Sequence, residues 1–163
     1  MKKVIVFLIA IFLNTAFGNP NKHHHGSNVE CILEIEDLNF GDYYPLEDSH
    51  LRTEALMKVK CSSAHGGAIT YKIKLLGGNS PNPKRRFMYS AKTGAKIYYN
   101  IFTPHSCVWG DGSNGTCTID DVIVIQNTSN EKAYLIRGIL YGGQKDVHVA
   151  DDYQDTLTVI IEY

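Results

Sequence analysis

The chain has 163 residues, of which 44% are hydrophobic and 20% charged, and its formal net charge is −1 at pH 7. A nearly neutral chain lacks the basic surface that attracts nucleic acid or anionic lipid, so we expect neither as a partner. The length allows one domain with its own hydrophobic core and is short for two.

The N-terminus has the pattern of a secretory signal peptide over residues 1–18. Two lysines precede an apolar run from Val4 to Leu13, and Ala16 and Gly18 supply the small residues before a cleavage site. The run is too short for a membrane anchor, so we expect no integral membrane segment in the mature chain. Cleavage after Gly18 leaves 145 residues with a formal charge of −3.

Residues 19–30 are predicted to form a mobile polar tail. The segment contains one aliphatic residue, shows no alternation and includes His23, His24 and His25. Neutral imidazoles bind nickel, copper or zinc, so these histidines are a candidate metal site. A mobile tail offers no preformed coordination geometry, and a solvated polar spacer is the favoured interpretation.

All four cysteines, Cys31, Cys61, Cys107 and Cys117, follow the predicted signal peptide. An even number of cysteines in an exported chain predicts disulfides, and no Cys-x-x-Cys spacing indicates a zinc or redox site. Three pairings are possible. The turn-rich segment between Cys107 and Cys117 makes local closure easy, which leaves Cys31 to pair with Cys61.

Beyond Cys31, apolar residues alternate with polar ones in several runs, the pattern of strands with one buried face. The clearest runs are 33–36, 57–61, 69–75 and 157–163. Clusters of turn-forming residues separate them, at 77–83, 127–130 and 142–143. Six to eight short strands at this spacing predict an all-β, two-sheet sandwich. Cys31 and Cys61 fall on the apolar faces of their strands, so both sulfur atoms should point into the core.

The sequence resembles the spore coat protein U domain family, which includes archaic chaperone-usher pilus subunits. The resemblance covers residues 31–163 and depends on motifs in the family's order. They are Cys31, LNFGDY at 38–43, VKC at 59–61, RFM at 86–88, YNIFT at 99–103, VWGDG at 108–112 and YQDTLTV at 153–159. The resemblance implies an immunoglobulin-like β-sandwich that is incomplete because it lacks its last strand.

In such a family member, an exported chaperone fills the resulting groove, and the N-terminal strand of a neighbouring subunit later replaces it. The resemblance therefore implies a periplasmic chaperone, an outer-membrane usher and neighbouring pilus subunits as partners. It also implies passage through the periplasm to the cell surface. The alternating residues Leu157, Val159, Ile161 and Tyr163 would lie at the groove's edge and pair with the chaperone. An ordinary core strand is the alternative interpretation of these four residues.

The loop that contains Trp109 and Asp111 has competing interpretations. Asp111 begins a run that resembles a calcium loop, but its acidic alternation stops early, so a turn is favoured. Trp109 offers a surface contact, yet its place in a family motif favours packing. The only basic cluster, at residues 84–86, is predicted to be a solvated turn.

One feature departs from the family. Polymerising members carry an apolar donor strand ahead of the first cysteine, where this chain has the polar tail of residues 19–30. We therefore expect a subunit that accepts a strand without giving one, as a minor or tip-located component of a pilus or surface coat serving adhesion or biofilm formation. No catalytic motif is present, and we expect neither an enzyme nor a cofactor. The second interpretation is a free-standing secreted binding module or envelope protein, and one form of it binds metal through the histidine tail. The third is an exported hydrolase.

Overall fold

The computed structural model describes the backbone of residues 4–12 and the whole of residues 29–163. These residues form ten strands and no helix, in agreement with the all-β prediction. The strands are β1 (Val4–Phe12), β2 (Val29–Ile35), β3 (Leu38–Gly41), β4 (Leu51–Ser63), β5 (Gly67–Gly77), β6 (Arg86–Tyr89), β7 (Lys96–Phe102), β8 (Ile119–Ile125), β9 (Ser129–Leu140) and β10 (Gln154–Glu162). Within the described ranges, a helix long and apolar enough to cross a membrane is not found.

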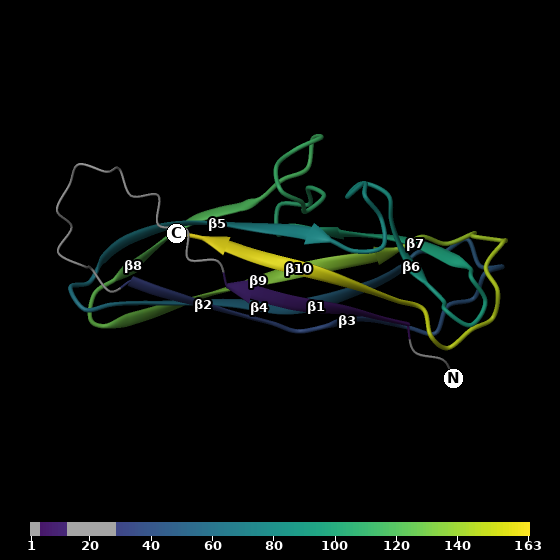
Figure 1. Ribbon diagram of the computed structural model, residues 1–163, viewed down its shortest axis with the longest axis horizontal. Helices are drawn as coiled ribbons and strands as arrows, with labels where there is room; N and C mark the ends of the chain where they lie inside the picture. The colour runs from purple at the N-terminus through teal and green to yellow at the C-terminus, as the bar shows by residue number, and fades with distance from the viewer. Residues whose placement is uncertain (1–3, 13–28) are drawn as a thin grey trace.

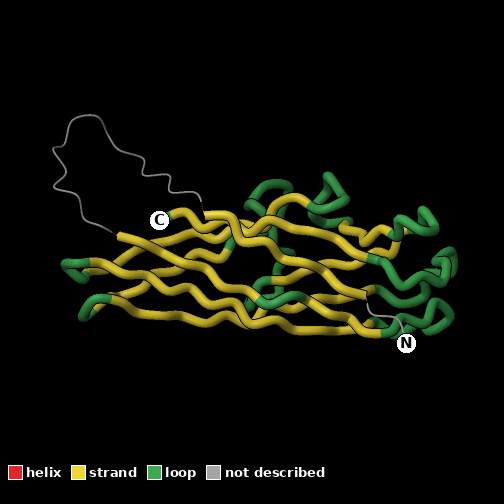
Figure 2. The backbone as a smooth tube through the Cα atoms, turned by 60° about the horizontal axis from the view of Figure 1, so that its bottom comes forward, coloured by secondary structure: helices red, strands yellow, loops and turns green. Residues whose placement is uncertain are grey.

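The strands form two layers that pack face to face. The first layer runs β2–β4–β9–β7, and the second runs β8–β5–β10–β1–β3. The short strand β6 pairs with both β7 and β10 and so joins the layers. The strands run along the long axis of the molecule, with most loops gathered at one end (Figures 1 and 2). This is the β-sandwich that the alternating pattern predicts.

The period of two determines which side chains enter the core between the layers. Leu33, Val59 and Ile73 are almost fully buried, each from a different strand, while their polar neighbours in sequence face outward. The other large buried apolar residues of the strands are Leu38, Phe40, Met57, Tyr71, Leu75, Met88, Ile97, Tyr99, Ile101, Ile119, Ile123, Ile125, Ile136, Leu140, Leu157, Val159 and Ile161. The core is therefore built from the inward face of almost every strand.

Both disulfides are formed. Cys31 and Cys61 lie directly opposite each other in the β2–β4 ladder, and their bridge is buried in the core. The Cys107–Cys117 bridge closes the loop between β7 and β8. The two bridges therefore act at different places: one staples two strands of the first layer, and the other shapes a loop.

The structure contains more strands than the sequence pattern predicts. β8 has no counterpart among the predicted runs, and β9 begins at Ser129, inside a segment predicted to be a turn. The pairing of β9 with β4 continues as far as Ser129 opposite Ser62, so tertiary pairing overrides the low strand propensity of this polar segment. Strand β2 likewise begins at Val29, two residues before the predicted start of the domain. The three tail histidines lie outside the described residues.

Removing the Cys31–Cys61 bridge should cost more stability than removing the Cys107–Cys117 bridge. The bridged cysteines are separated by 30 and 10 residues respectively. The chain-entropy model then gives losses of about 3.6 and about 2.7 kcal/mol. Urea unfolding of the Cys31→Ala/Cys61→Ala and Cys107→Ala/Cys117→Ala variants measures both losses. A loss at the loop bridge that equals or exceeds the loss at the core bridge would contradict the expectation.

Candidate functional site

Strand β1 lies between β10 and β3 in the second layer. It pairs parallel to β10, from Ile5 opposite Gln154 to Phe12 opposite Ile161, and antiparallel to β3. Figure 1 shows the purple β1 arrow beside the yellow β10 arrow, with both arrows pointing the same way. We call the space between β10 and β3 the acceptor groove. The strand that fills it comes from the segment predicted to be a signal peptide.

The inward face of β10 lines the acceptor groove. Leu157, Val159 and Ile161 are at most 1% exposed, and Tyr163 follows the end of β10 and packs partly buried against the core. The parallel register places Leu8, Ala10 and Phe12 of β1 opposite these three buried residues. On its other edge β10 pairs with β5. Without β1, therefore, β10 would have one unpaired edge over most of its length.

Asp155, near the start of β10, fixes the position of this strand. Its carboxylate accepts hydrogen bonds from the backbone N–H groups of Asn79 at 2.7 Å and Thr156 at 2.9 Å, and from the Tyr99 hydroxyl at 2.6 Å. Burial raises the pKa of the Asp155 carboxyl above its usual value, although these hydrogen bonds oppose the rise. The contacts tie β10 to the β5–β6 loop and to β7. In the sequence, only the family motif around residue 155 points to this aspartate.

Arg86 is a buried cation, which corrects the prediction that residues 84–86 form a solvated turn. Its side chain is 1% exposed, whereas Lys84 and Arg85 are exposed. The Nη1 group donates to three acceptors: the Pro83 carbonyl at 3.1 Å, the Asn100 side-chain oxygen at 3.0 Å and the Trp109 carbonyl at 3.0 Å. Burial lowers the pKa of the guanidinium. These acceptors converge from separate segments and offset part of the cost of burying the charge, which a single-sequence pattern cannot reveal. The Nε and Nη2 atoms of Arg86 are also buried, and neither has a hydrogen-bond partner among the described residues.

Trp109 packs in the core, as predicted. It is fully buried, and its indole N–H donates to the Ile73 carbonyl of β5 at 3.2 Å. The backbone N–H of Leu75, also on β5, donates to the Gly110 carbonyl at 3.0 Å. Asp111 accepts hydrogen bonds from the N–H and hydroxyl of Ser113, which makes the segment a turn. The loop is thus fixed against β5, the strand that supports β10 from the side opposite the groove.

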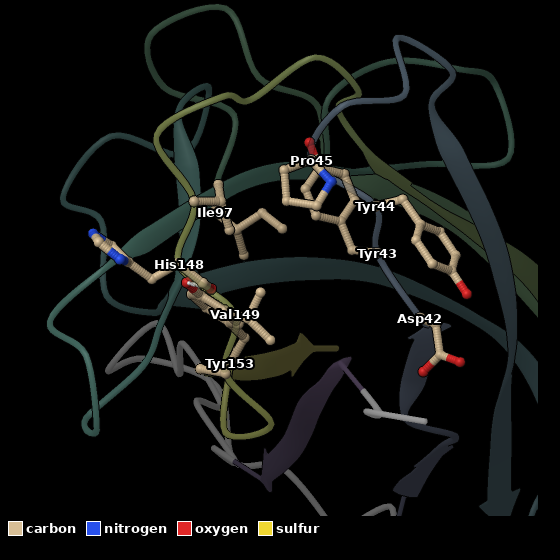
Figure 3. A pocket seen from close by; sticks show the side chains of 10 residues that line it. Asp42, Tyr43, Tyr44, Pro45, Ile97, His148, Val149 and Tyr153 are labelled. Atoms are coloured by element: carbon tan, nitrogen blue, oxygen red, sulfur yellow. Dashed lines mark hydrogen bonds between the residues drawn. The ribbon is translucent and has the colours of Figure 1, made fainter.

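A pocket of about 330 Å³ continues the acceptor groove beyond the first residue of β1. Its walls are the segment that follows β3 and the segment that precedes β10, and Figure 3 shows side chains from these two facing loops. The lining residues are Asp42, Tyr43, Tyr44, Pro45, Ile97, Val147, His148, Val149, Ala150 and Tyr153. Three apolar side chains of these loops are well exposed, Leu46 at 87%, Val149 at 77% and Tyr44 at 59%. No sequence pattern indicates this pocket, because its two walls are about a hundred residues apart in the chain.

The described residues offer no cluster of three or more histidine, cysteine, aspartate or glutamate side chains that could hold a metal ion. The geometry of the site is instead that of strand pairing. A strand edge binds an extended backbone by hydrogen bonds, and the adjacent row of apolar side chains buries the alternate side chains of that backbone. In the structure, β1 is the backbone that pairs with the edge of β10.

The family model described as the Spore Coat Protein U domain matches residues 26–160. No protein with a curated description matches the chain. A solved structure that resembles the fold is the CsuC–CsuE chaperone–tip adhesion subunit pre-assembly complex from the archaic chaperone-usher Csu pili of Acinetobacter baumannii. Its TM-score is 0.50 at 21% sequence identity, and the match covers 83% of this chain and 40% of the other, so this chain spans less than half of that protein's length.

The buried Asp155 should make a pH-dependent contribution to stability. Because its pKa in the folded state lies above the ordinary value of 3.8, the folded state binds this proton more tightly than the unfolded state does. The contribution of Asp155 therefore falls as pH rises from 3.8 through the folded-state pKa. The Asp155→Asn variant lacks this titration. The unfolding free energy of the wild type minus that of the variant should fall across this pH window in urea titrations.

Asp152→Asn is the matched control. Hydrogen bonds from the Ser90 hydroxyl and the Lys92 N–H hold the pKa of Asp152 below its ordinary value. Its stabilising contribution is lost as pH falls through the folded-state pKa, so the difference between wild type and control should rise with pH. A wild-type minus Asp155→Asn difference that stays constant with pH would show that the Asp155 pKa is not raised.

Proposed function

Since the chain belongs to the Spore Coat Protein U domain family, we propose that it is a secreted structural subunit of a chaperone-usher type pilus or surface coat, without enzymatic activity. It is assembled by β-strand complementation: another chain supplies the strand that completes its second layer. Assembly then occurs through the acceptor groove between β10 and β3. The alternating residues Leu157, Val159 and Ile161 form the apolar lining that the incoming strand covers.

The observation that carries this proposal is the origin of β1. The strand that fills the groove consists of residues 4–12, which the sequence assigns to a signal peptide cleaved after Gly18. Processing would remove β1 and leave β10 and β3 facing each other across an unpaired gap. The exported chain would then need a strand from elsewhere at the position that its own leader occupies in the structure.

The energetics favour uptake of a foreign strand. The parallel register aligns four residues of β1 with inward-facing residues of β10, from Asp155 to Ile161. Each apolar side chain that a complementing strand buries contributes roughly 1.5 to 3 kcal/mol. The total is comparable with the whole stability of a domain, about 5 to 15 kcal/mol. A chain without β1 is therefore marginal or prone to aggregate until a partner fills the groove.

A periplasmic chaperone is the first partner in this proposal. The similar solved structure is a complex of a chaperone with a tip adhesion subunit. The groove accommodates a strand parallel to β10, as β1 demonstrates, and the adjoining pocket gives space for a strand longer than β1. An outer-membrane usher and neighbouring subunits follow, and the chain passes from the periplasm to the cell surface.

The position of the subunit follows from its N-terminal tail. Residues 19–30 are polar and include three consecutive histidines, so they lack the alternating apolar residues that a donor strand needs. The subunit accepts a strand and gives none, which suits a tip or minor component in adhesion or biofilm formation. Recovery of the segment 19–30 inside the groove of a partner subunit would refute this position.

The pairing of β1 with β10 and β3 within one chain favours a second candidate function. If residues 4–12 remain attached after export, β1 completes the sandwich within a single chain, and the protein is a free-standing secreted module. The mass of the exported protein decides between the two: loss of residues 1–18 supports the subunit, and an intact N-terminus supports the module.

A chain of residues 19–163 should refold poorly and aggregate, because its groove is open. A synthetic peptide of residues 2–13, in which two lysines improve solubility, should restore a soluble monomer when it is present during refolding. Size-exclusion chromatography measures the recovery, and hydrogen exchange measures protection of the β10 amides. The matched control is the same peptide with Leu8→Pro, which removes a backbone donor opposite Leu157 and should not rescue.

The outcome against the proposal is equally specific. If residues 19–163 alone form a stable monomer whose β10 amides exchange as slowly as those of the full chain, the mature domain has no open groove. The subunit assignment would then fail.

A further inference from the structure

The side of the sandwich formed by β8 and β9 has two strand edges without a strand partner in the described part of the chain. β8 pairs only with β5. β9 pairs with β4 along its whole length but with β7 only from Arg137 onward, so residues 129–136 have one unpaired edge. The two edges lie near each other, one in each layer. Unpaired edges of this kind are the usual sites of unwanted strand addition.

The β8 edge has features that make strand addition favourable. Its outward side chains Val122 and Val124 are 41% and 52% exposed, and residues 122–125 are four consecutive β-branched aliphatic residues. In an antiparallel pair, every second residue directs both its N–H and its C=O away from the partner strand. The Val122 N–H and the Val124 carbonyl are both bonded to side chains, which places Val122 and Val124 among these residues.

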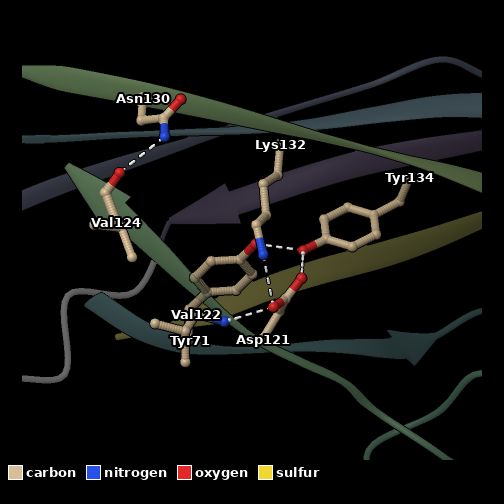
Figure 4. Close-up of polar contacts among 7 residues, drawn as sticks. All are labelled: Tyr71, Asp121, Val122, Val124, Asn130, Lys132 and Tyr134. Atoms are coloured by element: carbon tan, nitrogen blue, oxygen red, sulfur yellow. Dashed lines mark hydrogen bonds and ion pairs between the residues drawn. The ribbon is translucent and has the colours of Figure 1, made fainter. Parts of the chain in front are cut away.

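Asn130 of β9 connects the two edges. Its side-chain N–H donates to the Val124 carbonyl of β8 at 2.8 Å, and its side-chain oxygen accepts from the backbone N–H of Glu131 at 2.8 Å. One amide therefore satisfies a backbone acceptor of the second layer and a backbone donor of the first. Figure 4 shows the bond from Asn130 crossing to Val124.

Asp121 of β8 makes the second connection. Its Oδ1 accepts from the Val122 N–H and from Lys132 Nζ, both at 2.7 Å, and its Oδ2 accepts from the Tyr134 hydroxyl at 2.7 Å. Tyr134 in turn accepts a hydrogen bond from Tyr71 of β5. The hydrogen bond from Lys132 is the main cause that lowers the pKa of Asp121, which keeps this carboxylate ionised as an acceptor. Lys132 and Tyr134 both come from β9, so this carboxylate also spans the layers (Figure 4).

We propose that Asp121 and Asn130 block strand addition at the β8 edge by occupying two of its outward backbone groups, the Val122 N–H and the Val124 carbonyl, with side-chain hydrogen bonds. An incoming strand would have to break the Asp121–Val122 and Asn130–Val124 bonds before it could pair. These bonds prevent intermolecular strand pairing on this side of the second layer, although no further strand covers the β8 edge within the described residues. The β8 edge lies on the other side of the second layer from the acceptor groove, so the block operates whichever chain fills that groove.

The experiment uses the full chain, in which residues 4–12 fill the groove, so that its result does not depend on the proposed subunit role. The Asp121→Ala/Asn130→Ala variant should remain folded but self-associate, seen as oligomers in analytical ultracentrifugation. In hydrogen exchange at a concentration where the variant is monomeric, the Val122 amide should exchange about five- to tenfold faster than in the wild type. Asp120→Ala is the matched control, because it removes the same charge from the same strand while Asp120 contacts Lys72 and Thr118 only through side chains.

A proline tests whether association uses this edge. Val124→Pro removes an outward N–H, which an edge strand tolerates but a new ladder does not. Added to the double variant, it should restore the monomer. Asn130→Asp is a milder change for the case that the double variant does not fold. Its carboxylate still accepts from the Glu131 N–H but cannot donate to the Val124 carbonyl, so this variant should also self-associate. The proposal is overturned if these variants stay monomeric, or if the proline leaves the oligomers unchanged.

Discussion

The structure depends on strand pairing along the outer edge of β10. This strand contributes Leu157, Val159 and Ile161 to the core, and both of its edges are paired, one with β5 and the other with β1. On one side β10 pairs with β5, which the Trp109 loop supports, and Asp155 fixes the start of β10. The fixed elements thus define a position for one more strand, and the identity of that strand determines whether the domain is complete.

In the structure this strand is drawn from residues 4–12, and the same residues satisfy the pattern of a signal peptide. The two roles are compatible in composition, because a continuous apolar run suits both membrane targeting and a strand in the interior of a sheet. They exclude each other once a leader is cleaved, because cleavage would remove the strand that pairs with β10. Under the proposed function, this single proteolytic step would convert a domain that completes itself into one that needs a partner.

The sequence was sufficient for features that depend on local periodicity. The alternation around Leu33, Val59 and Ile73 predicted their strands and inward faces, and the core position of Cys31 and Cys61 followed from the same alternation. It was insufficient where several distant segments act on one group. Arg86 looks like part of a basic turn because the carbonyls that receive its hydrogen bonds are brought to it only by the fold. The pocket beside β1 and the contacts of Asn130 were not predictable for the same reason.

The two sides of the sandwich solve the problem of the unpaired edge in different ways, and the difference has a physical consequence. At the groove, the edge of β10 is covered by a backbone strand, which another strand of similar pattern can replace because the new ladder has the same hydrogen bonds. At β8, the edge is covered by Asp121 and Asn130, whose side-chain bonds an incoming strand would lose without recovering. Exchange is therefore nearly neutral in hydrogen bonding at the groove and unfavourable at β8. The proposed subunit would take up a strand at the edge of β10 and avoid pairing at the edge of β8, and this difference between the two edges allows both.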